Sequence, residues 1–295
     1  MHGSYDVSVV STFSFSRSRA GYNLNITEEM NVESLVILIV LLLAVYCTMA
    51  NQKTYRIYCY GDSLTAGLLP GGDHFPYAQI LRKQLQQIDP HIEVNFMGLS
   101  GWTAKELLKD TNYLPNALET GAPIDVVILL AGTNDLGHSL LPIEGGKTRE
   151  EEIFRDIWKM HVLAHSKNAR TIAISVPGSR FQYSHADAKA TCGRLNALIK
   201  SKCDEEPLCT YLQCPIDYSP GTPLFSEDGL HFSEEGYKRV AHNLVPVVLK
   251  ALGMERKADE YVINFGIKRG KDMEGTSIQR DDEVASGGAV GGISL

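Results

Sequence analysis

Apolar residues follow two different periods along most of this chain. Between residues 55 and 250, short apolar runs alternate with segments in which apolar residues recur every three or four positions. The first pattern is typical of strands and the second of amphipathic helices. Strands are predicted at five places, namely Tyr55–Tyr60, Glu93–Met97, Asp125–Ala131, Thr171–Val176 and Cys209–Leu212. Strands that alternate with helices build a parallel sheet with helices on both faces, so the sequence predicts an α/β fold with three layers.

Helices are predicted between these strands and after the last one. Three are marked by apolar positions on one face, over Tyr77–Ile88, Ile153–Ala164 and Leu195–Cys203. The last is expected to follow Ser233 as its N-cap, with acidic residues in the first turn. Pro246 is expected to kink or end this helix, because proline has no N–H to donate.

Both ends of the chain differ from this folded domain, which is predicted to cover residues 54–253. Residues 1–30 are rich in serine and lack a regular period, so they are expected to be unstructured. After Met254 the chain turns polar and then glycine-rich, which predicts a flexible tail over residues 254–295.

An unbroken run of 13 apolar residues, Leu35–Cys47, precedes the domain. A membrane span needs about 20 apolar residues and a signal-peptide core about 7–15, so residues 31–50 suit a signal peptide or a short signal anchor. A buried helix of the domain is a less favoured alternative. Either Met1 or Met30 could be the true start. Both leading interpretations predict the secretory pathway, with a secreted or membrane-anchored product and possible membrane association through residues 32–50.

Charge and cysteine content limit which partners, metal sites and disulfides the sequence predicts. The 295 residues include 28 Lys+Arg and 35 Asp+Glu, for a net charge of −7, and no basic patch is interleaved with aromatic residues. Nucleic acid is therefore not expected as a partner. The six cysteines form no C-x-x-C pair, which gives no support to a zinc ribbon. Four of them, Cys192, Cys203, Cys209 and Cys214, could form one or two disulfides in an oxidising compartment.

The end of the first predicted strand carries candidate chemistry in the segment Gly61-Asp62-Ser63-Leu64. A serine where a strand gives way to a helix lies near free backbone N–H groups, which suits a nucleophile that creates negative charge nearby. Alternatively, Asp62 and Ser63 only cap the following helix.

Candidate oxyanion donors follow the second and third strands. Gly101 lets a backbone N–H approach a substrate oxygen, and Asn134 offers a side-chain amide. A plain turn glycine and an Asx turn are the structural alternatives. Near the end of the domain, Asp228 precedes His231 by three residues and can orient its imidazole toward a serine. A solvated turn with a surface histidine is again the alternative.

Together, the segments Gly61-Asp62-Ser63-Leu64, Gly101, Gly132-Thr133-Asn134-Asp135 and Asp228-Gly229-Leu230-His231 resemble the four signature blocks of the SGNH (GDSL-type) hydrolases. The resemblance covers roughly residues 55–252. It implies a flavodoxin-like sandwich with strand order 2-1-3-4-5 and ester hydrolysis without a metal or cofactor. By position, it implies Ser63 as nucleophile, His231 as base, Asp228 as its orienting acid, and an oxyanion hole from Ser63, Gly101 and Asn134.

Several alternatives remain open at this stage. The same fold could serve a lysophospholipase, thioesterase or acyltransferase, or a non-catalytic flavodoxin-like or carbohydrate-binding module. No G-x-S-x-G elbow surrounds Ser63, which argues against an α/β-hydrolase. The loops Leu68–Phe75, His138–Lys147 and Ser179–His185 follow strand ends and are expected to wall the site. Their mixed side chains suit a small-molecule, lipid or carbohydrate ester, and their histidines are interpreted as loop residues rather than metal ligands.

Overall fold

A computed structural model describes residues 32–50, 53–138 and 149–265, which separate into two compact units at Thr54. The first unit contains helix α1 (Val32–Ala50), which coincides with the apolar segment at residues 31–50. Across the described parts of the chain, no helix is both long and apolar enough to span a membrane. The segment predicted to be unstructured, residues 1–30, lies outside the described residues.

The second unit is built on one sheet of five parallel strands. These are β1 (Tyr55–Gly61), β2 (Ile92–Gly98), β3 (Val126–Leu130), β4 (Arg170–Ile174) and β5 (Cys209–Leu212). Their order is β2-β1-β3-β4-β5, with β3 buried along its whole length. All five strands lie where the apolar runs predicted them, and the α/β class and strand order are confirmed.

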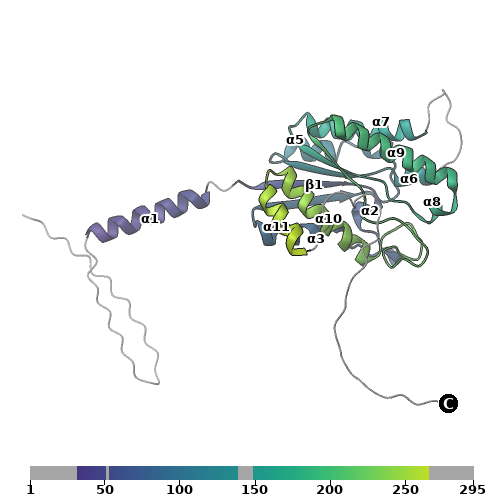
Figure 1. Ribbon diagram of the computed structural model, residues 1–295. Coiled ribbons are helices and arrows are strands. Elements are labelled where there is room, and N and C mark those ends of the chain that lie inside the picture. The colour runs from purple at the N-terminus through teal and green to yellow at the C-terminus, as the bar shows by residue number, and fades with distance from the viewer. Residues whose placement is uncertain (1–31, 51–52, 139–148, 266–295) are drawn as a thin grey trace, which may run out of the picture. The chain divides into compact units, whose positions relative to one another are not determined.

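Helices cover both faces of the sheet, as Figure 1 shows. One layer holds α3 (Tyr77–Ile88), α10 (Glu234–Ala251) and α11 (Glu255–Phe265), and the other holds α4 (Ala104–Lys109), α5 (Leu114–Thr120), α7 (Arg149–His165) and α9 (Ala186–Glu205). Because side chains alternate along a strand, Ile57 and Cys59 pack under the first layer and Tyr60 under the second. Three short helices lie at the strand ends, namely α2 (Ser63–Ala66), α6 (Thr133–His138) and α8 (Arg180–Ser184).

Two glycines bring the strand ends into close contact. A Cβ on Gly61 would lie 2.0 Å from the Leu130 carbonyl oxygen, and one on Gly98 would lie 2.0 Å from the Ala66 backbone nitrogen. Only glycine therefore allows β1 to approach the end of β3, and β2 to approach α2, this closely. This packing gathers the carboxyl ends of β1, β2 and β3 at one edge of the sheet, where ligands of such folds bind.

The last helices differ from the sequence prediction. Ser233 caps α10 as expected, but the helix continues through Pro246 to Ala251. Val245 and Val248, on either side of the proline, are fully buried, so packing outweighs the missing hydrogen bond. The expectation of a flexible tail from residue 254 is also wrong for Glu255–Phe265. This segment forms α11, whose Ala258 and Tyr261 pack against the core, while residues 266–295 lie outside the described residues.

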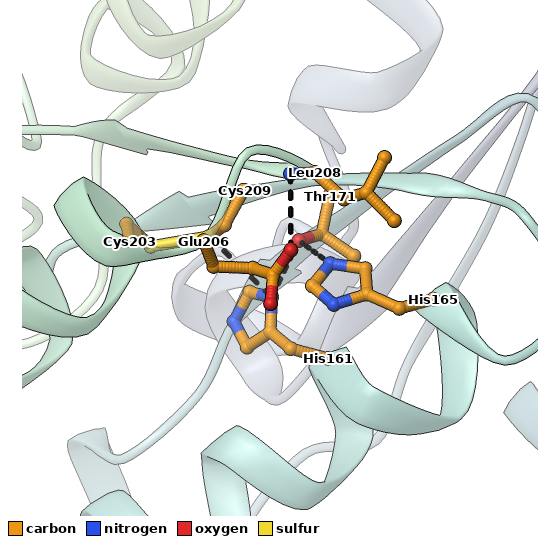
Figure 2. The surroundings of a disulfide bond; sticks show 7 residues. All are labelled: His161, His165, Thr171, Cys203, Glu206, Leu208 and Cys209. Atoms are coloured by element: carbon orange, nitrogen blue, oxygen red, sulfur yellow. Dashed lines mark hydrogen bonds between the residues drawn. A yellow bond between two sulfur atoms is a disulfide. The ribbon is translucent and has the colours of Figure 1, made fainter.

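Cys203 and Cys209 form a disulfide that links the end of α9 to the start of β5 (Figure 2). The sequence left the pairing of the four C-terminal cysteines open, and the fold decides it. Cys192 and Cys214 are free, buried thiols, as is Cys59. Burial raises the pKa of each of these three thiols to about 12, so they stay protonated and pack as small apolar groups.

Candidate active site

Ser63 is the first residue of α2, directly after the end of β1. A residue in this position has an N–H that no carbonyl of the helix can accept. The helix cap is Asp62, whose Oδ1 accepts the Leu64 N–H at 3.0 Å. The capping interpretation therefore holds for Asp62, while the Ser63 hydroxyl remains available for other contacts. Ser63 is a buried residue, only 4% exposed.

His231 joins Ser63 to Asp228, although the serine lies 168 residues earlier in the chain. The imidazole Nε2 is 2.9 Å from Ser63 Oγ, and Nδ1 is 2.6 Å from Asp228 Oδ2. The three residues thus form a continuous hydrogen-bonded chain. This is the arrangement that the D-x-x-H spacing predicted, and it excludes a solvated turn with a free histidine.

Asp228 determines which ring nitrogen of His231 carries the proton. Partial burial alone would raise the pKa of the Asp228 carboxyl, but hydrogen bonds from His231 and from the Leu230 and His231 N–H groups outweigh it. The pKa therefore lies below its ordinary value, and the carboxylate is ionised at neutral pH. An ionised carboxylate only accepts hydrogen bonds, so Nδ1 carries the proton and Nε2 accepts from the Ser63 hydroxyl.

The turn that carries Asp228 and His231 is held in place on both sides. Ser226 N–H donates to the His231 carbonyl at 2.8 Å, and Ser226 Oγ donates to the Phe232 carbonyl at 2.9 Å. From α8, the Arg180 N–H donates to the Gly229 carbonyl at 2.8 Å, and the Arg180 guanidinium donates to the Glu227 carbonyl. The acid and base therefore sit on a preorganised turn rather than a loose loop.

Gly101 and Asn134 follow the ends of β2 and β3, respectively. Gly101 has φ +83°, a left-handed conformation that favours glycine, and a Cβ there would meet nothing within 4 Å. Backbone conformation, and not a close neighbour, therefore favours glycine at this position. The Asn134 Nδ2 donates to the Trp102 carbonyl at 2.8 Å, which ties the start of α6 to the residue after Gly101.

Asp62 is the fully buried acid beside these groups. Its burial raises the pKa of the carboxyl to about 7, against the lowering effect of the Leu64 N–H. The nearby Asp135 carboxylate raises it further. Asp62 is therefore more easily protonated than an exposed aspartate, which disfavours negative charge next to Ser63.

A cavity of about 540 Å³ adjoins these residues, between α6, α8 and the Asp228 turn. Its lining includes Asn134, Phe181, His185, Asp228 and Leu230. The predicted wall at Ser179–His185 is therefore largely helical (α8) rather than a loop. Of the predicted wall at His138–Lys147, residues 139–147 lie outside the described residues, and Leu68–Phe75 contains a short 3-10 turn.

The predicted loops contain three histidines, His74, His138 and His185, which are possible metal ligands by residue type alone. His185 Nδ1 is 3.0 Å from the Phe181 carbonyl oxygen, and its ring packs on that of Phe181. His74 is exposed. In the portion of the chain that the structure describes, no group of three or more His, Cys, Asp or Glu side chains could hold a metal ion.

Two supporting residues were not assigned roles from the sequence. Arg180 lies within the predicted loop Ser179–His185, and Asp135 is the last residue of a signature block. Both act through contacts between segments far apart in sequence, namely Arg180 with Gly229 and Asp135 with Ala104. Neither contact has a local sequence signal.

Comparison with known proteins identifies the family of this chain. The model of the GDSL-like lipase/acylhydrolase family matches residues 59–239. An isoamyl acetate-hydrolyzing esterase of Schizosaccharomyces pombe is 28% identical over 207 residues, which cover 68% of this chain and 78% of the esterase.

Solved structures show the same fold at low identity. A lipase, Lip_vut3, from a goat rumen metagenome has a TM-score of 0.54 at 18% identity, covering 69% of this chain and all of that one (100%). A GDSL-like lipase of Bacteroides thetaiotaomicron has a TM-score of 0.50 at 20% identity, covering 70% of this chain and 97% of that one. With the family model spanning more than half of its length, the chain belongs to the GDSL-like lipase/acylhydrolase family and is an ester-bond hydrolase.

Proposed function

We propose that this protein is a serine esterase that hydrolyses carboxylic esters through an acyl-enzyme. The single observation that carries the proposal is the hydrogen-bonded chain from Ser63 Oγ through His231 to the ionised Asp228. A serine hydroxyl is a weak nucleophile, and a neutral imidazole at 2.9 Å is positioned to take its proton.

In the first half of the reaction, Ser63 Oγ attacks the carbonyl carbon of the ester while its proton passes to His231 Nε2. Asp228 stabilises the imidazolium that results. The carbonyl oxygen becomes an oxyanion, which the N–H groups of Ser63 and Gly101 and the Asn134 amide would stabilise. Collapse of this intermediate breaks the bond to the alcohol oxygen, which takes the proton from His231 and leaves.

In the second half, water replaces the alcohol. His231 Nε2 takes a proton from the water as its oxygen attacks the acyl carbon. A second oxyanion forms and collapses, the carboxylic acid leaves, and the proton returns to Ser63 Oγ. No step calls on a metal or an organic cofactor.

Short-chain esters are the first substrates to examine. The relative in fission yeast is named for hydrolysis of isoamyl acetate, which supports an acetate ester as a starting point. The cavity beside Asn134 combines Phe181 and Leu230 with the polar Arg180 and Gln182, so it suits an acyl or alcohol group of mixed character. A panel of acyl esters that includes acetylated sugars, lysophospholipids and thioesters would rank the substrate classes.

Ser63→Ala is expected to abolish ester hydrolysis, because the nucleophilic oxygen is removed and the remaining site has nothing to acylate. A fluorophosphonate probe should label the wild-type protein at Ser63 and leave the variant unlabelled, as read by peptide mass spectrometry. Melting temperatures should be similar, since only one oxygen is lost.

Ser166→Ala is a matched control, because Ser166 is an exposed serine near the C-terminal end of α7. This variant should hydrolyse esters and react with the probe as the wild type does. Labelling at another residue, or hydrolysis that survives in Ser63→Ala, would refute the mechanism. A wild type that neither reacts with the probe nor hydrolyses any ester would favour the non-catalytic alternative.

A further inference from the structure

The turn that carries Gly101 is held partly by its side chains, because Leu99 and Trp102 pack against the core and the Trp102 ring lies edge-on to Tyr113. Hydrogen bonds at its two ends hold its backbone. At the first end, the Leu99 N–H donates to the Gly61 carbonyl at 2.9 Å, which joins the turn to the strand end before Ser63. Within the turn, the Trp102 N–H donates to the Leu99 carbonyl at 3.2 Å.

At the second end, two consecutive residues of α6 hold the same turn. The Asn134 amide donates to the Trp102 carbonyl at 2.8 Å, and the Asp135 carboxylate accepts the Ala104 N–H at 2.8 Å. Asn134 and Asp135 thus bind the chain on either side of Thr103, three residues or fewer after Gly101. The backbone of Asp135 is itself anchored, because the Arg149 guanidinium donates to its carbonyl at 3.2 Å.

We propose that Asp135 is a positioning residue of the oxyanion hole, which fixes the Gly101 N–H relative to the Asn134 amide through its hydrogen bond to Ala104. This inference rests on the proposed function and assigns a role that the triad and the oxyanion donors do not include. Asp135 does not touch the substrate in this proposal. Its effect arises because a donor displaced by a fraction of an ångström stabilises the oxyanion less well.

What the site requires of Asp135 is a hydrogen-bond acceptor and not a negative charge. A carboxylate close to the oxyanion hole repels the charge that develops there. Burial also raises the pKa of Asp135, although the Ala104 N–H opposes that rise. An asparagine keeps an acceptor oxygen at the same place without the charge, whereas a leucine keeps the approximate shape without an acceptor.

The test compares Asp135→Asn and Asp135→Leu with the wild type by three quantities: kcat, KM and the Ki of a phenylboronic acid. The boronic acid forms a tetrahedral adduct with the serine, and one oxygen of this adduct occupies the oxyanion hole. Active sites are counted with the fluorophosphonate probe. Asp135→Leu is expected to lower kcat about tenfold to a hundredfold, to leave KM little changed and to raise the boronic acid Ki by a similar factor. Asp135→Asn should remain close to the wild type in all three values.

Asp125→Leu is the matched control, because the Asp125 carboxylate also accepts a backbone N–H, that of Arg56, at 2.8 Å. This bond lies at the amino ends of β1 and β3, away from the candidate site at their carboxyl ends. It should lower the melting temperature and leave kcat per active site unchanged. Unchanged kcat and Ki in a destabilised Asp135→Leu would overturn the proposal, as would a loss in Asp135→Asn equal to that in Asp135→Leu. A wild type that neither hydrolyses esters nor reacts with the probe would instead overturn the proposed function, and this inference with it.

Discussion

At the scale of single residues, adjacent residues in the sequence have different roles at the candidate site. Asp62 caps α2, and Ser63 meets the histidine. Asn134 and Asp135 show the same division, since one is a candidate oxyanion donor and the other accepts a backbone N–H of α4. Short polar side chains suit such sites because they reach backbone groups with little loss of conformational entropy.

Asn134→Ala is expected to lower kcat about 10²–10³-fold, as loss of one oxyanion donor does in comparable sites. KM should change little, because the interaction strengthens chiefly in the transition state. Steady-state kinetics and thermal unfolding on the same preparation measure both properties.

Asn196→Ala is the control for that measurement. The Asn196 side chain binds both the N–H and the carbonyl of Val176, at 2.8 and 2.9 Å, so its loss should lower the melting temperature without lowering kcat. An Asn134→Ala protein that behaves like this control, destabilised but fully active, would remove Asn134 from the oxyanion hole.

At the scale of elements, a buried polar cluster joins α7 to the start of β4. Thr171 of β4 is fully buried, and its hydroxyl lies 2.8 Å from His161 Nδ1 and 2.9 Å from His165 Nε2. Figure 2 shows both histidines turned toward Thr171. The Cys203–Cys209 disulfide lies beside the same histidines. This end of the fold therefore relies on hydrogen bonds that depend on neutral imidazoles.

The cluster predicts that stability declines on acidification. Burial lowers the pKa of His161 from 6.5 to about 3, so below pH 6.5 the unfolded chain binds a proton that the native state does not. The His161 contribution is complete above pH 6.5 and is lost as the pH falls toward 3. Between pH 6.5 and pH 5 this loss amounts to about 2 kcal/mol of unfolding free energy.

Urea unfolding of the wild type and of His161→Gln, at the two pH values given above, measures the contribution of His161 to the unfolding free energy. Asp62, whose raised pKa acts in the opposite direction, is common to both proteins and cancels in the comparison. The variant should lose less stability on acidification than the wild type, whereas the exposed His74→Gln should match the wild type. Equal losses in wild type and His161→Gln would contradict the assignment.

At the scale of the whole molecule, the hydrolase domain is accompanied by a separate apolar helix, α1. We propose that this segment directs the protein into the secretory pathway. The disulfide between Cys203 and Cys209 supports the proposal, because such bonds persist in oxidising compartments.

Expression in secretory cells is expected to give one of two products. A cleaved segment yields a protein that begins near Asn51, and an anchor yields a protein that stays with membranes after a carbonate wash. N-terminal sequencing and fractionation separate the two, and a variant lacking Leu35–Cys47 should enter neither route. A cytosolic, unprocessed and soluble wild type would refute the proposal.

The amino-acid sequence alone determined the α/β class, the five strands and the residues that the family motifs mark. The apolar run Val126–Leu130 predicts a buried strand wherever it occurs, because period and composition are local properties. The D-x-x-H spacing likewise predicts the contact between Asp228 and His231, since three residues span a single turn. The class of chemistry followed from these local signals taken together.

Only the tertiary structure decided which distant groups meet. The contact of His231 with Ser63 spans 168 residues, and that of Asp135 with Ala104 spans 31, so both depend on strand order and on how closely the strands pack. The pairing of Cys203 with Cys209 was also decided by the tertiary structure. So was α11, because its sequence is mostly polar and only two of its residues are buried in the core. Such contacts form only after the sheet has brought its strand ends and covering helices together, and no local pattern records them.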